Sequence, residues 1–272
     1  MTKATRRSPE RVRPARAAAG RVEVARAGGC VTATLEWPAA RTRAAHNAAQ
    51  RLTAAMALRL IELAEEIEDD AEALMLVLRG AGGNFCAGFD DDVDSIAPSV
   101  VESIAVLSKP TLAIIGGLAA DEGMELALAA DLRVAAQSAR FTISQLGRGR
   151  MPRFGGTQRL PRLIGAAHAL RMLLTGEAID GGEAMRLGLV TYVASGRAAL
   201  ERVAGEVVHA VTSRGPVAAR LAKEAVRKGC DLTLDQGIRL EEDLYALLQT
   251  TADRAEGVRA FLDKRKPLFR GA

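Results

Sequence analysis

Two short apolar runs constrain the fold of this chain most. Leu74–Leu78 reads LMLVL and Thr111–Ile115 reads TLAII. A strand with one wet face alternates apolar and polar residues, whereas an unbroken apolar run suits a strand covered on both faces of a parallel sheet. Residues with helical periodicity precede each run, over Asn47–Glu68 and around Val100–Leu107. We therefore expect strand–helix–strand units with right-handed crossovers, which is an α/β fold.

The sequence before and after these runs predicts the rest of the organisation. Alternating apolar residues over Arg21–Trp37 indicate a β-hairpin. A third strand of the parallel sheet is expected at Leu132–Ala135. We therefore divide the chain into a disordered tail at residues 1–20, an α/β core at 21–210 and a helical C-terminal region at 211–272.

Helical periodicity dominates the second half of the chain. One short strand at Leu189–Val193 should interrupt it. The expected helices are Gly155–Ile164, Ala166–Leu174, Gly182–Leu187, Ala198–Val211, Val217–Lys228 and a stretch from Leu234 to the region of Leu262.

The composition disfavours several classes of function. The chain has 272 residues, 49% of them hydrophobic and only 3% aromatic, so one large domain must build its core from aliphatic side chains. No apolar run approaches the roughly 18 residues of a membrane span. Because no secretory segment is recognisable either, we expect a cytoplasmic protein with no membrane partner. The spacing of cysteines and histidines predicts reduced thiols and no metal site. These residues are Cys30, Cys86, Cys230, His46, His168 and His209.

The positive charge of the chain is concentrated at its start. The formal net charge is +4. The segment Met1–Arg21 is rich in Lys and Arg, has the single acid Glu10, and is interrupted by Pro9 and Pro14. This composition predicts a disordered basic tail. Such a tail could be a solvated leader, contact nucleic acid or direct the protein to an organelle.

One carboxylate has an unusual sequence context. Ala119–Asp131 reads AADEGMELALAAD, so Glu125 is followed directly by an apolar run. An acid at a helix start can simply face solvent, where it meets the positive end of the helix dipole. If the helix is packed inside the protein, however, the carboxylate must be paired, hydrogen-bonded or raised in pKa.

Two glycine-containing segments follow the apolar strands. Asn84–Asp90 (NFCAGFD) comes after the first, and Gly116–Gly123 after the second. In open α/β sheets, ligands bind where the C-terminal ends of strands meet helix N-termini. Backbone N–H groups are unpaired there, and two of them converging on one carbonyl oxygen would form an oxyanion hole. Small residues at such points can also serve turns alone.

These segments and several others, in order along the chain, resemble the crotonase superfamily, the enoyl-CoA hydratase/isomerase group. The resemblance covers roughly Val22–Gly271. The segments that carry it are NFCAGFD, the stretch from Lys109–Pro110 through Gly117 and GMELA to Ala130–Asp131, then Phe141, Met151–Gly165 (MPRFGGTQRLPRLIG), Leu174–Val190 (LTGEAIDGGEAMRLGLV) and Phe261–Phe269 (FLDKRKPLF).

The resemblance implies a crotonase spiral of ββα turns with a helical C-terminal region that forms trimers, often as a dimer of trimers. It implies an acyl-CoA thioester as substrate and no cofactor, since coenzyme A is part of the substrate. The thioester oxygen would lie between the backbone N–H groups of Phe89 and Glu122. A glycine is usual at position 122, so if the backbone there needs a positive φ, the glutamate would cost about 1 kcal/mol or more.

The resemblance also implies two catalytic glutamates in the hydratases. Glu125 matches the first, which activates water. The second position holds Gln145, and an amide cannot exchange a proton near neutral pH. Gln145 could still orient water or substrate by hydrogen bonds. A single positioned acid or base contributes about 10² to 10⁴-fold in rate.

The remaining site residues are also carried by the resemblance. Arg148, Arg150 and Arg153 stand in a block that is mostly apolar or glycine in the hydratases. They could neutralise nearby acids or face solvent, or Arg150 or Arg153 could pair with a carboxylate on an unusual acyl group. The residues expected to bind substrate and coenzyme A are Ala45, Ala87, Phe89, Asp90, Gly123 and Lys264.

Three functions remain open from the sequence. The first is an enoyl-CoA hydratase-like enzyme with Glu125 as its acid/base. The second is another crotonase reaction on acyl-CoA that needs one base, such as isomerisation, thioester hydrolysis, decarboxylation or C–C cleavage, because residue 145 is glutamine. The third is a non-catalytic or RNA-binding family member, which the scarcity of aromatic residues for base stacking disfavours.

Overall fold

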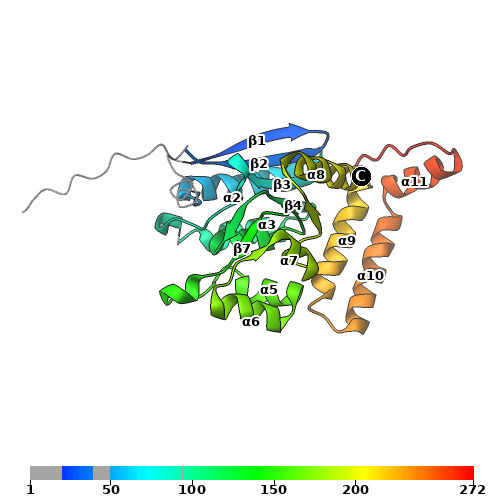
Figure 1. The fold of residues 1–272 in the computed structure, drawn as a ribbon. Coiled ribbons are helices and arrows are strands. Elements are labelled where there is room, and N and C mark those ends of the chain that lie inside the picture. The colour runs from blue at the N-terminus through cyan, green and yellow to red at the C-terminus, as the bar shows by residue number, and fades with distance from the viewer. Residues whose placement is uncertain (1–19, 39–49, 94) are drawn as a thin grey trace, which may run out of the picture.

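The computed structural model describes residues 20–38, 50–93 and 95–272. A six-stranded sheet forms its centre, in the order β1-β2-β3-β4-β6-β9 (Figure 1). The first pair is antiparallel and all the others are parallel. The strands are β1 Arg21–Ala27, β2 Cys30–Glu36, β3 Met75–Gly80, β4 Thr111–Ile115, β6 Leu132–Ala136 and β9 Tyr192–Ala194.

The apolar runs lie where the sequence predicts them. All five residues of β4 are buried, and so are the first four of β3. The hairpin is also confirmed, with β1 and β2 in a continuous antiparallel register. The strand predicted at Leu189–Val193 is displaced toward the C-terminus, since β9 begins only at Tyr192. Leu189 is buried instead through a turn, in which its N–H donates to the carbonyl of Ala184.

A second, small sheet has the order β5-β7-β8. The first two strands pair in parallel and the last two antiparallel. The sequence predicted none of them, because two or three residues are too short to show an alternating pattern. The strands are β5 Leu118–Ala120, β7 Arg140–Thr142 and β8 Ile179–Asp180.

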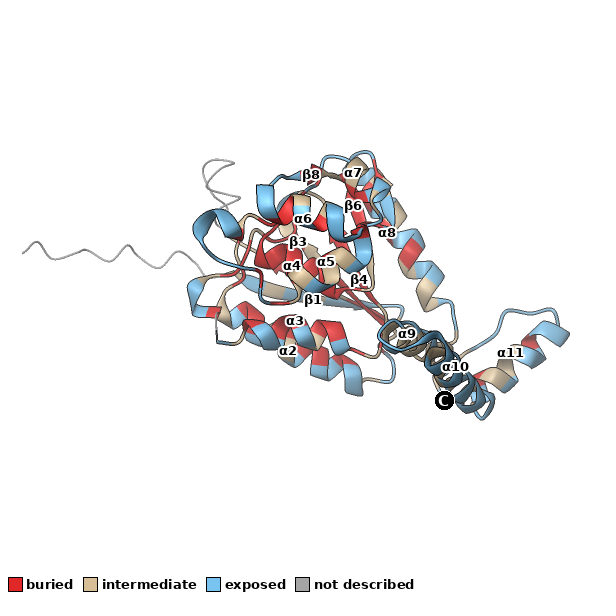
Figure 2. Cartoon of the chain, turned by 90° about the horizontal axis from the view of Figure 1, so that it is seen from below, coloured by how far each residue is buried: buried red, intermediate tan, exposed pale blue. Residues whose placement is uncertain are grey.

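Helices cover the large sheet, and the buried residues converge on it (Figure 2). Helix α2 (Ala54–Asp69) begins at the N-cap Thr53, whose hydroxyl accepts from Met56 N–H. It packs beside α3 (Ala97–Val106). All eight residues of helix α4 (Glu122–Ala129) are buried. Its N-terminus, which carries Glu125, is therefore inside the protein.

Short 3₁₀ turns and further helices complete the described chain. The 3₁₀ turns η1 Ala81–Gly83 and η2 Asp91–Val93 precede α4, and η3 Gln145–Arg148 follows it. The following helices are α5 Gly156–Ile164, α6 Ala166–Thr175, α7 Gly181–Arg186, α8 Arg197–Thr212, α9 Pro216–Gly229, α10 Leu234–Gln249 and α11 Ala252–Leu262.

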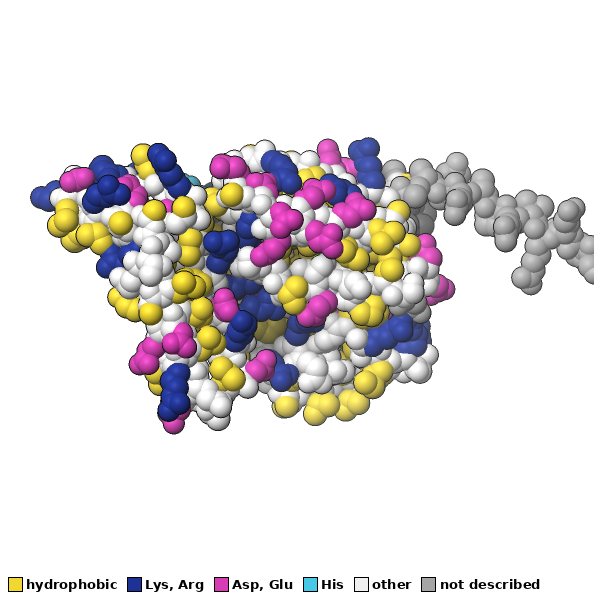
Figure 3. Space-filling model, turned by 180° about the vertical axis from the view of Figure 1, so that it is seen from behind, with side chains coloured by type: hydrophobic (Ala, Val, Ile, Leu, Met, Phe, Trp, Pro, Cys, Tyr) yellow, Lys and Arg dark blue, Asp and Glu magenta, His cyan; other side chains and the backbone are white. Residues whose placement is uncertain are grey.

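The last three helices project from the sheet (Figure 1). Every residue of α9 and α10 is described, and none is buried. Figure 3 shows many hydrophobic side chains on the surface at this end of the molecule. The exposed apolar residues of this region are Val226, Leu232, Leu234, Ile238, Tyr245, Leu247, Val258, Phe261, Leu262 and Leu268.

One charged contact fastens α9 to the core. Lys223 Nζ lies 2.6 Å from the carboxylate of Asp131 and donates to the carbonyl of Lys109 at 2.8 Å. The Asp131 carboxylate also accepts from the N–H and hydroxyl of Thr111, at the start of β4. The C-terminal helices are therefore joined to the sheet through a partly buried ion pair.

Candidate active site

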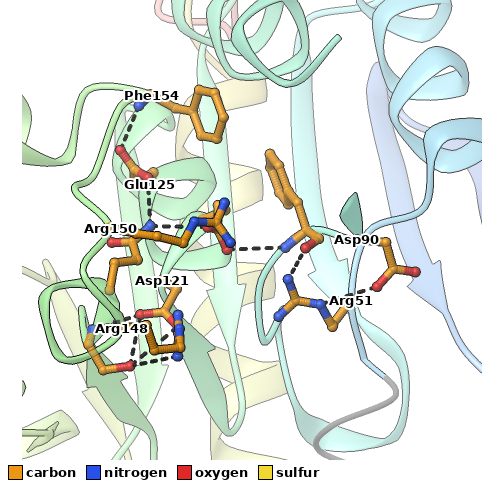
Figure 4. Close-up of polar contacts among 11 residues, drawn as sticks. Arg51, Asp90, Asp121, Glu125, Arg148, Arg150 and Phe154 are labelled. Carbon is orange, nitrogen blue, oxygen red and sulfur yellow. Dashed lines mark hydrogen bonds and ion pairs between the residues drawn. The ribbon is translucent and has the colours of Figure 1, made fainter. Parts of the chain in front are cut away.

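Glu125 lies in the first turn of α4 and is completely buried. Its Oε1 accepts from two backbone N–H groups, those of Phe154 and Gly156, each at 2.8 Å (Figure 4). Gly156 begins α5, so its N–H is one of the groups that a helix start leaves unpaired. The carboxylate is thus held by the backbone, and among the described residues no cation pairs with the same oxygen.

Burial raises the pKa of Glu125 above its ordinary value of 4.5. Loss of hydration is the main cause, and the two backbone hydrogen bonds and Gln145 oppose it. The negative charge of Glu122 raises the pKa a little further. A carboxyl group with a raised pKa can both take and return a proton, which is the property that acid–base catalysis requires.

Gln145 is brought beside Glu125 by the η3 turn and is also buried. Its Nε2 lies 3.4 Å from Oε2 of Glu125 and 3.2 Å from Oε1 of Glu122. Two carboxylates can only be bridged by the amide NH₂, so the amide oxygen points away from them. That oxygen is buried and has no hydrogen-bond partner among the described residues. It is available to accept a hydrogen bond from water or a substrate hydroxyl.

Asp121 ties the start of α4 to the η3 turn. Its Oδ1 accepts from the N–H of Ser144 at 2.6 Å, directly before Gln145. Its Oδ2 forms an ion pair with Arg148 at 2.7 Å. Asp121 has φ 49° and ψ −120°, a conformation that favours glycine, whereas Glu122 already belongs to the helix. The positive φ considered for Glu122 therefore falls one residue earlier.

The segment 84–90 lies against the same end of α4. Phe89 N–H donates to Oε2 of Glu122 at 3.3 Å. The neighbouring N–H groups of Leu52 and Asp90 are used in a bridge between the two backbone segments, so Phe89 N–H is left for the site. Arg51 fastens the segment by donating to the carbonyl of Phe89 and to the carboxylate of Asp90.

Two glycines allow this close packing. A Cβ at Gly123 would lie 2.2 Å from the carbonyl oxygen of Cys86, so only glycine lets α4 approach the segment 84–90. Gly88 has φ +135°, and a Cβ there would lie 2.9 Å from Oε2 of Glu122. Gly123 thus has a packing role beside its predicted place in substrate binding.

Aromatic rings form the wall next to Glu125. The rings of Phe89 and Phe154 stack with centroids 5.8 Å apart and planes inclined by 25°. The guanidinium carbon of Arg153 lies 5.1 Å from the centroid of Phe154, and its side chain is exposed. Arg153 therefore reaches the site only at its edge.

The arginines of η3 and the residues after it pair with acids of the chain. Besides the ion pair of Arg148 with Asp121, Arg150 lies 3.7 Å from Oε1 of Glu122. This agrees with the explanation that these arginines neutralise the unusual acids before Glu125.

The structure does not bring every predicted binding residue together. Ala87 and Asp90 lie beside Phe89, and the N–H of Ala87 donates to the carbonyl of Gln50. Lys264 is exposed and follows α11, a helix that lies beyond α9 and α10 from α4 (Figure 2). Ala45 lies outside the described residues. Within one chain, Lys264 is thus not part of the Glu125 site.

A cavity of about 630 Å³ lies elsewhere, at the C-terminal ends of β2, β3 and β4. Its charged lining includes Arg79 and Glu201, which pair with one another. The carboxylate of Glu201 is exposed and its pKa is lowered by Arg79, whereas that of Glu125 is buried and raised in pKa. Glu125 is therefore the better candidate for a catalytic acid or base. In the described part of the chain, no group of His, Cys, Asp and Glu is arranged to hold a metal ion. No described helix is long and apolar enough to span a membrane.

Comparison with known proteins places these features in one family. The sequence model described as enoyl-CoA hydratase/isomerase matches residues 40–272. The chain belongs to the enoyl-CoA hydratase/isomerase family. The resemblance seen in the sequence motifs is thereby confirmed, together with the crotonase fold.

Individual members of the family match over most of their length. A crotonyl-CoA hydratase from Syntrophomonas wolfei is 35% identical over 216 residues, which are 75% of this chain and 83% of the relative. A mitochondrial methylglutaconyl-CoA hydratase from Mus musculus is 37% identical over 229 residues, 78% of this chain and 73% of the relative. The crystal structure of an enoyl-CoA hydratase from Bacillus anthracis superposes with a TM-score of 0.85 and 34% identity, covering 93% of this chain and all of that one.

Sequence reasoning missed several residues that build the site. Asp121, Phe154 and Gly156 hold Gln145 and Glu125 in place, yet their roles were not predicted. Gly155 has φ +105° directly before α5, and a glycine pair before a helical pattern is a recognisable signal for a helix start with free N–H groups. Glu125, which accepts from the N–H of Gly156, lies 31 residues earlier in the chain. No local sequence pattern relates the two residues.

Proposed function

We propose that the protein hydrates the α,β double bond of a 2-enoyl-CoA thioester. The observation that carries this function is the Glu125 carboxylate, buried, fixed by two backbone N–H groups and raised in pKa. Glu125 would take a proton from water as the water oxygen bonds to the β-carbon. The α-carbon would then receive a proton, and Glu125 in its acid form can return the one it took.

In this proposal Gln145 orients the water rather than exchanging protons. Its Nε2 lies 3.4 Å from Glu125, and its Oε1, which has no partner among the described residues, can accept one hydrogen of the water. The negative charge that develops on the thioester oxygen would be received by the N–H groups of Phe89 and Glu122. The bond from Phe89 N–H to a carboxylate oxygen supports this, because it shows that an oxygen atom can reach that donor.

Coenzyme A would be bound by Ala87, Phe89, Asp90 and Gly123 at the start of α4. Lys264, which is not part of the Glu125 site within one chain, and Ala45, which lies outside the described residues, remain proposed contacts. Family members named for a crotonyl-CoA and a methylglutaconyl-CoA substrate support an acyl-CoA substrate. A methylglutaconyl thioester has one free carboxylate at the end opposite the thioester, so Arg153 at the edge of the site remains a proposed contact for such a group.

A second candidate is another reaction of the same acyl-CoA site. The specific observation in its favour is that position 145 holds an amide in place of a second acid. Isomerisation, thioester hydrolysis, decarboxylation and C–C cleavage each need one base at this place. A third candidate, RNA binding through the basic tail, concerns residues 1–20, nearly all of which lie outside the described residues.

We further propose that residues 21–210 form the catalytic core and residues 211–272 the assembly region. The exposed apolar residues of α9–α11 support a homotrimer or a dimer of trimers, since a monomer rarely exposes so many. Size-exclusion chromatography with light scattering would measure the assembly, and a monomer would contradict it. A cytoplasmic location remains a prediction, and some relatives are named as mitochondrial.

Loss of the enoyl-thioester absorbance of crotonyl-CoA tests the proposed reaction. The wild-type protein should consume crotonyl-CoA, and a Glu125→Ala variant should not. If wild type is inactive but binds coenzyme A in a calorimeter, the second candidate replaces the first. If the Glu125→Ala variant retains full activity, the proposed role of Glu125 is wrong.

A further inference from the structure

The side chain of Glu122 accepts a hydrogen bond from a backbone N–H that the proposed function assigns to the substrate. Its Oε2 lies 3.3 Å from Phe89 N, one of the two N–H groups proposed to receive the thioester oxygen. A backbone N–H has one hydrogen to donate. While Glu122 accepts it, a substrate oxygen cannot use the same donor in full.

The carboxylate is enclosed in this position on several sides. Only 4% of the Glu122 side chain is exposed. Its Oε1 accepts from Nε2 of Gln145 at 3.2 Å. The lack of a side chain at Gly88 makes room for Oε2, which would lie 2.9 Å from a Cβ there. Contacts on both oxygens show a fitted position rather than a side chain resting on a surface.

We propose that the Glu122 carboxylate is an internal ligand of the oxyanion hole, which the thioester oxygen of an acyl-CoA must displace. This inference rests on the proposed function, because it assigns Phe89 N–H to the substrate oxygen. A carboxylate is a charged acceptor and binds an amide N–H more strongly than a neutral thioester oxygen does. Glu122 therefore weakens the binding of acyl-CoA by competing with its thioester oxygen, and it does not affect the contacts of the coenzyme A part.

Arg150 is positioned to pair with the Glu122 carboxylate after it is displaced. Its guanidinium lies 3.7 Å from Oε1 of Glu122, and 40% of its side chain is exposed. Rotation of the Glu122 side chain toward Arg150 would free Phe89 N–H and keep the carboxylate near a positive charge. The N–H of Glu122 itself belongs to the backbone and stays in place, so the hole would then have both donors.

Binding of two matched ligands tests the displacement. Butyryl-CoA has the thioester oxygen but no double bond to hydrate, and free coenzyme A lacks the thioester. Calorimetric titration of wild type and Glu122→Gly should show about tenfold tighter binding of butyryl-CoA in the variant, the scale of a competing hydrogen bond to a charged group. The affinity for coenzyme A should not change. Glu206→Ala, which removes an exposed carboxylate on α8, should change neither affinity.

Steady-state kinetics on crotonyl-CoA give a second measurement. The increase in kcat/KM of the Glu122→Gly variant should lie in KM, because displacement is completed when substrate binds. If the glycine variant does not fold, Glu122→Ala removes the same carboxylate and is a better helix former. Thermal melting before each titration identifies a variant that is unfolded.

Each other outcome overturns the inference in a distinguishable way. If both ligands bind wild type but removal of the carboxylate leaves butyryl-CoA affinity unchanged, Glu122 is no competitor and the proposed function stands. If affinity for both ligands rises equally, Glu122 only narrows the pocket. If removal abolishes turnover without tighter binding, Glu122 is itself a catalytic acid or base. If neither protein binds either ligand, the proposed function fails together with the inference.

Discussion

The side-chain amide of Gln145 lies 3.4 Å from the carboxylate of Glu125, although the two residues are 20 positions apart and on different elements. The same amide nitrogen lies 3.2 Å from Glu122. Gln145 thus separates two acids that would otherwise face each other across the site. An acid at this position would add both a second group that can exchange a proton and a further negative charge to the site.

We expect Gln145→Glu to raise the rate of crotonyl-CoA hydration. The variant gains a second group that can exchange a proton, and such a group is worth about 10² to 10⁴-fold when well placed. A lower part of that range, about 10²-fold, is expected because Glu122 and Glu125 repel the new charge. Gln145→Leu keeps a similar volume without hydrogen bonding and should lose activity. No gain in the glutamate variant would favour the isomerase, hydrolase or lyase alternatives.

Glu125→Gln should reduce hydration by about 10² to 10⁴-fold while keeping the shape of the site. The amide oxygen can still accept from Phe154 and Gly156, so the fold is preserved, but no proton can be taken. In the wild type, Glu125 acts as a base only when ionised. The acid limb of the kcat/KM profile should therefore have its inflection above pH 4.5, the ordinary value for glutamate, because burial raises the pKa. An inflection at or below 4.5 would contradict this.

Stability should also depend on the ionisation of Glu125. A carboxyl group whose pKa is raised in the folded state binds protons more tightly there than in the unfolded chain. Its contribution to stability is therefore fully present below the unfolded pKa and is lost as the pH rises through the folded pKa. The melting temperature of Glu125→Gln, compared with wild type at each pH, should become relatively higher as the pH increases above about 4.5. A difference independent of pH would show that Glu125 titrates normally.

The parts of the fold that were predicted from the sequence are those with a local signal. β4 was placed at Thr111–Ile115 because a strand buried on both faces is apolar throughout. The strand β5, only three residues long, has no such signal. Its pairing with β7 depends on residues more than 20 positions further along the chain.

The candidate site divides in the same way. Glu125 was singled out because an acid beside an apolar run must be satisfied or shifted in pKa. Its neighbour Gln145 was identified only by resemblance to the family. Helical periodicity does not reveal that the later turn η3 packs against the start of α4. The contact of Glu122 with Phe89 follows from how α4 packs against the segment 84–90. No pattern within either segment contains that information.

Asp121 should stabilise the site more than its ion pair alone suggests. Asp121→Ala removes the acceptor for Ser144 N–H and leaves a non-glycine residue at φ 49°, so we expect a loss of about 2–3 kcal/mol in the free energy of unfolding. Arg148→Ala removes only a half-exposed partner and should cost less than about 1 kcal/mol. Asp121→Asn keeps an acceptor for Ser144 and tolerates positive φ, so its cost should lie near that of Arg148→Ala.

Urea unfolding of the three variants measures these differences, and hydration of crotonyl-CoA measures their effect on the site. Because Ser144 immediately precedes Gln145, Asp121→Ala should also lower the hydration rate under conditions in which the variant is folded. Arg148→Ala should leave the rate close to that of wild type. Equal losses of stability in Asp121→Ala and Arg148→Ala would mean that Asp121 contributes only a surface ion pair. The η3 turn would then be held in place by its other contacts.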